Sequence, residues 1–298
     1  MTAHELQNAL SAAEAPLLVQ VLPEEVFAAK RIPGSKQACV YEVAFLDHIA
    51  ARTSDKARAI IVYGAGGGSL DAKVAAEKLA AAGFTNVTAF EGGLDAWSAA
   101  GLPLEGEGVL PASPTLSGSF AVDTAQSLIR WTGRNLFNHH SGTVRLAEGE
   151  IVLRENALVS ARFRIAMDSI ACEDISDSAM NRMLIAHLHT DDFFDVAHHP
   201  VAEFTATSIT PLATCTDGTP NYLLRGQFTM RGITREIEFP ILVATADGQR
   251  LTAQGVLDLD RTQFGSVYGS GRLFRFLGKH IVNDHIHLHI KLHADLKS

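Results

Sequence analysis

The chain has 298 residues, of which 47% are hydrophobic and 19% are charged, and its formal net charge at pH 7 is −8. This length accommodates two ordinary domains, and the composition excludes extensive disorder. The acidic balance argues against nucleic acid or an anionic membrane surface as the main partner.

The N-terminal segment, MTAHELQNALSAAEAPLLVQ, lacks the basic and apolar regions of a signal peptide. No run of about 18 apolar residues occurs, so no stable membrane insertion is expected. The cysteines Cys39, Cys172 and Cys215 lie far apart without a C-x-x-C pair, which favours reduced thiols and indicates no sulfur-based metal site. We therefore expect a cytoplasmic protein.

Residues 1–107 alternate short apolar strands with helical segments. Strands are expected at 17–21, 59–63 and 86–90, and helices at 2–13, 41–53, 71–83 and 94–101. This alternation predicts an α/β domain with a parallel sheet and helices on both faces.

A glycine-rich turn, GAGGGS, connects one of these strands to the next helix, and such a turn presents backbone N–H groups that favour an anion. It is not a P-loop, because Gly68 is followed by Ser69 and Leu70 rather than by Lys and Ser or Thr. A dinucleotide fingerprint fails at its third glycine, where Ser69 stands, and the unit is short for a Rossmann domain.

The segment LAAAGFTNVTAFEGGLDAWSAAGLP, with LPEEVFAAKRIPGS and AIIVYGAGGGS before it, resembles the rhodanese-like family over about residues 5–105. The resemblance implies a cysteine that heads the loop and forms a persulfide stabilised by backbone amides. Here that position is Gly64 or Gly66, and no cysteine lies between Cys39 and Cys172.

We therefore expect a vacant rhodanese loop and a non-catalytic docking or regulatory module, although the loop could retain an anion or metabolite pocket. The vacant loop consists of Gly64, Ala65, Gly66, Gly67, Gly68 and Ser69. The alternative is a sulfurtransferase or redox enzyme in which Cys39 is a displaced nucleophile.

Residues 108–118 belong to a stretch rich in Gly, Pro and Ser, which predicts a linker. From residue 119 to 298 the hydrophobic period becomes two. In one run Val159, Ala161, Phe163, Ile165 and Met167 share a face. Many such strands predict an all-β antiparallel sandwich or up-and-down barrel, and the segment SDSAMNRMLIAHLHTDDFFD suggests one inserted helix.

The runs WTGRNLFNHHSGTVRLAEGEI, HLHTDDFFDVAHHPVAEFTATSI, RGQFTMRGITREIEFP and LDLDRTQFGSVYGSG resemble the YceI-like family over about residues 119–298. The resemblance implies a lipocalin-like barrel that encloses a polyisoprenoid, an isoprenoid quinone or a fatty-acid-like small molecule, and binding rather than catalysis. A packed core is the alternative reading of the same apolar residues. The expected ligand-binding positions are Trp131, Phe163, Ile165, Phe193, Phe204, Phe228 and Phe264.

Eleven of the thirteen histidines follow Gly118. His285, His287, His289 and His293 share one face of a strand and could hold Zn²⁺ or Cu²⁺, but they face solvent if Ile286 and Leu288 point inward. His139 and His140 are better candidates for a barrel mouth. A histidine-based metal protein is thus a further alternative; no cofactor is otherwise expected, and a homodimer is one option for the assembly.

Overall fold

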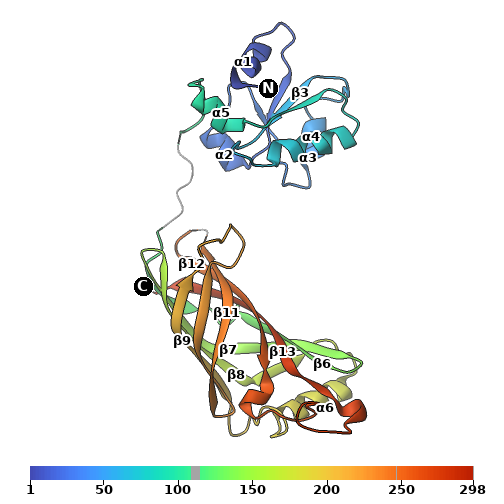
Figure 1. Ribbon diagram of the computed structural model, residues 1–298, viewed down its shortest axis with the longest axis vertical. Helices are drawn as coiled ribbons and strands as arrows, with labels where there is room; N and C mark the ends of the chain where they lie inside the picture. Colours follow the sequence, from blue (N-terminus) through green and yellow to red (C-terminus); the bar gives the residue numbers. More distant parts are fainter. Residues whose placement is uncertain (109–114, 246, 298) are drawn as a thin grey trace. The chain divides into compact units, whose positions relative to one another are not determined.

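The computed structural model describes residues 1–108, 115–245 and 247–297. The chain divides into two compact units, Met1–Ala112 and Ser113–Ser298, which are blue to teal and green to red in Figure 1. Residues 109–114 of the expected linker lie outside the described residues. The expected domain bounds at 107 and 119 stay predictions.

The first unit is a parallel sheet with strand order β2-β1-β3-β4 and helices on both faces, which confirms the predicted α/β class. Its strands are β1 (Leu17–Gln20), β2 (Lys36–Gln37), β3 (Ile60–Tyr63) and β4 (Val87–Phe90). Its helices are α1 (Ala3–Leu10), α2 (Glu24–Ala29), α3 (Phe45–Ala50), α4 (Asp71–Ala81) and α5 (Gly93–Ala99).

All four residues of β3 are buried. Because successive side chains point to opposite sides of a strand, both faces of β3 are covered. Val62 packs in the cluster that holds Phe45 of α3 and Leu79 of α4. Tyr63 packs in the other cluster, with Leu6 of α1 and Trp97 of α5. Each face of the sheet therefore has its own apolar core.

The helix expected at 41–53 is wrong in its first turn, because α3 begins only at Phe45. The Glu42 amide donates to the Cys39 carbonyl and the Phe45 amide donates to the Glu42 carbonyl. These bonds span three residues, so the chain forms tight turns there instead of an α-helix.

The second unit is an antiparallel sheet of nine strands that closes on itself through the pairing of β12 with β13 (Figure 1). Strands β5 and β6 each pair with both β7 and β13, at successive places along these two strands. They therefore count together as one strand of the barrel, which has eight. The strands are β5 (Gly118–Val122), β6 (Leu128–Asn135), β7 (His139–Arg154), β8 (Ala157–Cys172), β9 (Val201–Pro211), β10 (Tyr222–Met230), β11 (Ile233–Thr245), β12 (Arg250–Asp260) and β13 (Val282–Leu296). The predicted all-β barrel is confirmed.

The predicted inserted helix is α6 (Ser178–His189), which lies at the end of the barrel opposite the C-terminus (Figure 1). The Asp177 side chain caps it by accepting hydrogen bonds from the Ala179 and Met180 amides, each at 2.9 Å. Short 3₁₀ turns at Arg261–Phe264 and Gly278–His280 flank the loop that leads into β13 at this same end.

The expected inward face of residues 159–167 is wrong at Val159, which is 43% exposed, whereas Leu158 is 5% exposed. The register between β7 and β8 shifts between Val152 and Leu153. A β-bulge at this point adds one residue to the strand and reverses which residues face inward.

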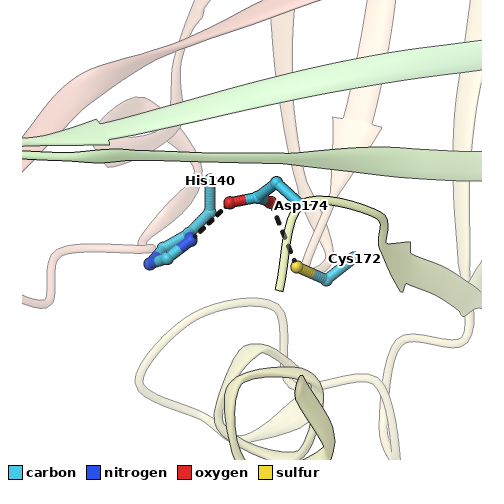
Figure 2. A group of neighbouring side chains, drawn as sticks. All are labelled: His140, Cys172 and Asp174. Carbon is cyan, nitrogen blue, oxygen red and sulfur yellow. Dashed lines mark hydrogen bonds and ion pairs between the residues drawn. The ribbon is translucent and has the colours of Figure 1, made fainter. Parts of the chain in front are cut away.

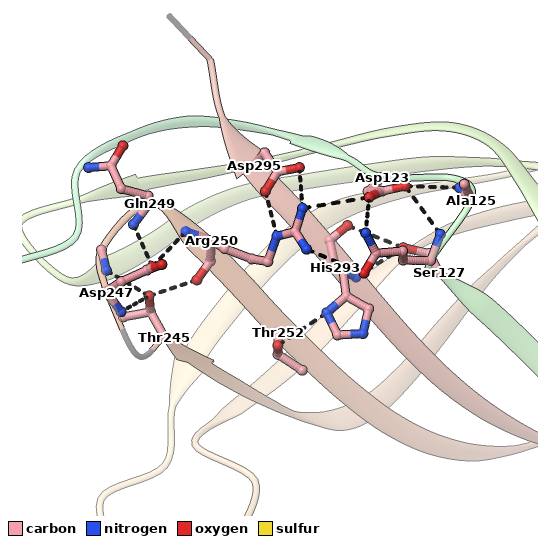
Figure 3. A network of polar contacts seen from close by, with 12 residues as sticks. Asp123, Ala125, Ser127, Thr245, Asp247, Gln249, Arg250, Thr252, His293 and Asp295 are labelled. Atoms are coloured by element: carbon pink, nitrogen blue, oxygen red, sulfur yellow. Dashed lines mark hydrogen bonds and ion pairs between the residues drawn. The ribbon is translucent and has the colours of Figure 1, made fainter.

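A polar network around Arg250 of β12 connects the strands at the end of the barrel opposite α6 (Figure 3). Its guanidinium donates to both oxygens of Asp295 at 2.6 and 2.9 Å and lies 3.7 Å from Asp123. Ser127 bonds the backbone of His293 from the β5–β6 turn. These contacts tie β12, β13 and the β5–β6 turn together, away from the end that carries α6.

Candidate ligand-binding site

The barrel contains a cavity of about 340 Å³ beneath α6. It lies where β6 ends and β13 begins, so it opens at the α6 end of the barrel rather than at the Arg250 end. Its apolar walls come from Ile129, Trp131, Val144, Ile165, Met167, Ile170, Leu184, Leu188, Phe193, Phe194, Ala202, Phe228, Met230, Leu259, Tyr268, Ile281, Val282, Ile286 and Leu288.

Polar side chains border the same cavity at the ends of strands and in the loops. Arg134 lies next to the end of β6, His140 lies next to the start of β7, and Lys279 and His280 precede β13. Arg134, Lys279 and His280 are exposed. The cavity therefore combines apolar walls with polar side chains at its border.

The structure brings together some of the positions expected from sequence and separates others. Trp131, Ile165, Phe193 and Phe228 all line the main cavity. Ile165 and Phe228 also border a second, smaller apolar cavity of about 50 Å³, where Phe163 and Phe204 lie. Phe264 is 1% exposed and packs edge-to-face on Phe228 with ring centroids 5.4 Å apart, so it is a core residue.

Sequence reasoning missed the contribution of α6, whose Leu184 and Leu188 cover the cavity. It also missed Met167 and Met230, which are flexible apolar side chains suited to an adaptable pocket. The helical spacing of Leu184 and Leu188 was a usable signal, because residues four apart share a helix face.

Arg261 is a second residue that the sequence did not single out. It borders the cavity and is 1% exposed. Its guanidinium donates to the carbonyls of Ser266, Tyr268 and Asn283 at 2.6, 2.8 and 3.0 Å. Burial lowers the pKa of Arg261, and the charges of Asp284 and Asp260 oppose that effect. Arg261 therefore fixes the loop that forms one wall of the mouth.

His140 belongs to a cluster with Cys172 and Asp174 (Figure 2). His140 Nδ1 lies 3.0 Å from Asp174 Oδ2, and Cys172 Sγ lies 3.3 Å from Asp174 Oδ1. Burial acts to raise the pKa of Asp174, but hydrogen bonds from the Ser141 amide, His140 and Cys172 outweigh it and lower this pKa to about 2. Burial raises the pKa of the Cys172 thiol, so this cysteine is not an activated nucleophile.

The row of histidines on the last strand lies outside the barrel. His285 and His289 are exposed, while Ile286 and Leu288 line the cavity. His287 contacts Asp258 at 2.9 Å. Among the described residues, the three metal-ligating side chains that lie close together are those of the His140 cluster, and none of them belongs to this histidine row.

The glycine-rich loop of the first unit surrounds a carboxylate of the chain itself. Asp71 is 4% exposed, and its Oδ2 accepts hydrogen bonds from the Ala65 amide at 3.1 Å and from the Ser69 hydroxyl at 2.8 Å. A Cβ atom at Gly64 would lie 2.1 Å from Asp71 Cγ, and one at Gly66 would lie 2.2 Å from the Gly92 carbonyl oxygen. Neither candidate position for a cysteine therefore has room for a side chain in this conformation.

Cys39 follows β2 and is 3% exposed. Reactive cysteines usually combine partial exposure with a nearby positive charge. The surroundings of Cys39 thus do not resemble those of an activated thiol.

A YceI-like domain model matches residues 120–294, and a rhodanese-like domain model matches residues 2–100. Because the first match covers more than half of the chain, the chain belongs to the YceI-like family. It carries a rhodanese-like domain ahead of its YceI-like domain.

Solved structures with similar folds include BcnA from Burkholderia cenocepacia, at 23% identity and a TM-score of 0.46 over 58% of this chain and 98% of that one. A polyisoprenoid binding domain from Saccharophagus degradans has 14% identity and a TM-score of 0.45 over 60% of this chain and 98% of its own. The rhodanese-like domain of the Anabaena sp. Alr3790 protein has 32% identity and a TM-score of 0.33 over 38% of this chain and 85% of its own. No curated protein matches the chain.

None of the helices formed by the described residues combines the length and apolar character needed to cross a membrane.

Proposed function

We propose that the YceI-like barrel binds an amphiphilic or isoprenoid lipid, such as a polyisoprenoid, an isoprenoid quinone or a fatty-acid derivative. The observation that carries this proposal is the cavity of about 340 Å³, whose walls are apolar and whose polar residues gather at the mouth. Membership of the YceI-like family supports the same ligand class.

Apolar enclosure explains how such a ligand is held with few polar contacts. Each methylene group removed from water contributes about 0.8 kcal/mol. A chain that enters between α6 and the strands replaces empty space next to Trp131, Met167 and Leu184. Its polar group then remains near Arg134 and Lys279, which are exposed to solvent.

We infer that the rhodanese-like domain is a non-catalytic docking or regulatory module. The loop position of the expected cysteine is glycine, and Asp71 occupies the space within the loop. The full chain is expected to show no sulfur transfer from thiosulfate to cyanide. Turnover that disappears on Cys39→Ser would contradict this and would restore the enzyme hypothesis.

Native mass spectrometry of the protein as purified from cells, followed by organic extraction, tests the main proposal. We expect a co-purifying lipid, or stoichiometric uptake of a fluorescent fatty acid or of a farnesyl probe. A barrel that carries no lipid and takes up neither probe contradicts the proposal.

Two tryptophan substitutions on α6 localise the binding. Leu184→Trp fills the cavity and is expected to weaken probe binding at least about tenfold, because it removes the space that the chain needs. Met183→Trp is the matched control, since Met183 is 66% exposed on the same helix. Equal probe affinities of the two variants would place the binding outside this cavity.

We also expect a cytoplasmic location, where the free thiols Cys39, Cys172 and Cys215 stay reduced. Cell fractionation tests this expectation. The assembly state, including the homodimer, is a separate question for light scattering.

A further inference from the structure

Three metal-ligating side chains come together at the end of the sheet where β7 begins and β8 ends. Gly142 of β7 lies opposite Cys172 of β8, and the Glu173 amide donates to the Ser141 carbonyl at 2.9 Å. The same register brings His140 opposite Asp174. Asp174 lies in a bend just after β8, and its Oδ1 lies 3.3 Å from Cys172 Sγ.

The ligand atoms of these residues already lie near the separations that a metal ion requires. One atom from each of His140, Cys172 and Asp174 lies within 4.8 Å of the others. Tetrahedral bonds of the lengths found in zinc sites place neighbouring ligand atoms about 3.3–3.8 Å apart. His140 Nδ1 lies 3.0 Å from Asp174 Oδ2 and Cys172 Sγ lies 3.3 Å from Asp174 Oδ1, so the two contacts use different carboxylate oxygens, and binding an ion through one of them requires a small rotation of the side chains (Figure 2).

We propose that His140, Cys172 and Asp174 bind a divalent transition metal ion, with Zn²⁺ as the expected ion and one coordination position left for water. A set of imidazole, thiolate and carboxylate suits Zn²⁺, whereas Ca²⁺ and Mg²⁺ prefer oxygen ligands alone. On binding, the Cys172 thiol releases its proton to solvent, and the thiolate and the carboxylate balance the charge of the ion.

Neighbouring groups hold the three side chains in place. The Ser141 amide donates to Asp174 Oδ1 at 2.7 Å and thereby orients the carboxylate. The Asn181 side chain of α6 donates to the Cys172 carbonyl at 2.9 Å and ties the end of β8 to the helix. His140 also lines the lipid cavity, so the open coordination position would lie at the cavity mouth.

No short sequence motif reveals this site. His140 and Asp174 are separated by 34 residues along the chain, and only the antiparallel register brings them together. The absence of a C-x-x-C pair therefore does not exclude a metal site that uses a single cysteine with partners from another strand.

The site is tested on the full-length protein after chelator treatment, first with Zn²⁺ in competition with a chromogenic chelator and then with Co²⁺. We expect one tightly bound ion per chain and a thiolate-to-cobalt charge-transfer band in the near ultraviolet. Cys172→Ser should abolish that band, and His140→Gln and Asp174→Asn should each weaken Zn²⁺ binding at least about tenfold.

Matched controls separate this site from other thiols and histidines. Cys215→Ser removes an exposed thiol and His139→Gln removes an exposed neighbouring imidazole, and both are expected to keep the band and the affinity. Thermal unfolding of each metal-free variant shows whether it is folded, and Cys172→Ser is nearly isosteric.

Absence of stoichiometric Zn²⁺ binding overturns the proposal. So does binding that is unchanged in Cys172→Ser but lost in His287→Gln, which would assign the ion to the outer histidine row. The metal titration uses no lipid, so its outcome is independent of the proposed lipid binding.

Discussion

The side chain of Asp71 accepts two hydrogen bonds from the rhodanese-like loop, one from the Ala65 amide and one from the Ser69 hydroxyl. Asp71→Ala is expected to lower the free energy of unfolding of the first unit by about 1–3 kcal/mol, because the Ala65 amide and the Ser69 hydroxyl lose their acceptor. Urea unfolding in a Trp131→Phe background measures this, since Trp97 is then the one remaining tryptophan.

Asp47→Asn is the matched control for that substitution. Asp47 also lies in the first turn of its helix, but it is exposed, so its replacement should leave the unfolding free energy nearly unchanged. If the Asp71→Ala and Asp47→Asn variants had equal free energies of unfolding, the hydrogen bonds around Asp71 would contribute nothing to the stability of the first unit.

Glu150 makes the stability of the barrel depend on pH. The hydrogen bond from Lys297 is the largest cause that lowers the pKa of Glu150 from 4.5 to about 2, and the Ser119 hydroxyl adds a second hydrogen bond at 2.6 Å. A carboxylate with a depressed pKa stabilises the folded state above pH 4.5, and this contribution disappears as the pH falls from 4.5 to about 2.

Glu150→Gln is therefore expected to have a lower Tm than the unsubstituted protein at neutral pH, and the difference should vanish towards pH 2. Thermal unfolding followed by circular dichroism at several pH values measures this. Asp217→Asn, which removes an exposed carboxylate from a turn of the barrel, is the control substitution. A Tm difference that stays constant across the acid range would assign the effect of Glu150→Gln to packing instead of charge.

At the scale of elements, residues 271–280, GRLFRFLGKH, form a loop that we call the rim loop. Phe276 is 103% exposed and Phe274 is 47% exposed. Both border a shallow groove with Tyr268 and His280, and these two residues also line the main cavity. The rim loop thus offers apolar surface on the way into the cavity.

The double substitution Phe274→Ser and Phe276→Ser is expected to slow the transfer of a fluorescent fatty acid from vesicles several-fold. The equilibrium affinity should change little, because neither phenylalanine lines the main cavity. Stopped-flow fluorescence measures the rate, and Val256→Ser on the outside of the barrel is the control. A loss of affinity with an unchanged rate would show that the rim loop belongs to the binding site itself.

Hydrophobic patterning predicted most elements of the first unit and the all-β character of the second with its inserted helix, because a period of two or 3.6 indicates which residues face a core. It could not reveal the bulge at Val159, since an extra residue leaves no mark in composition. It also predicted which aromatic residues point inward but not how deep they lie. Phe264 packs in the core while Trp131 lines the cavity, and that difference depends on strand tilt and stagger.

At the scale of the whole molecule, each unit has its own apolar interior. The barrel core contains no member of the two clusters that flank the first sheet, as far as the described residues show. Independent cores predict independent folding, so the exact start of the barrel matters for any fragment that carries the proposed lipid site.

Leu116 lies before the expected domain start at residue 119, yet it belongs to the barrel. Its side chain is 8% exposed within the barrel core. Its amide donates to Asn156 Oδ1 at 2.6 Å, and its carbonyl accepts from the Asn156 amide at 2.8 Å. The chain is therefore anchored to the β7–β8 hairpin two residues before β5 begins.

A fragment of residues 119–298 is expected to be less stable than one of residues 115–298 by about 2–4 kcal/mol, because it lacks a buried leucine and its hydrogen bonds. Urea unfolding of the two fragments measures the difference, and both should still bind the lipid probe when folded. Leu116→Ala in the longer fragment isolates the side chain and should account for most of the loss. Equal stability of the two fragments would instead support residue 119 as the true start of the barrel.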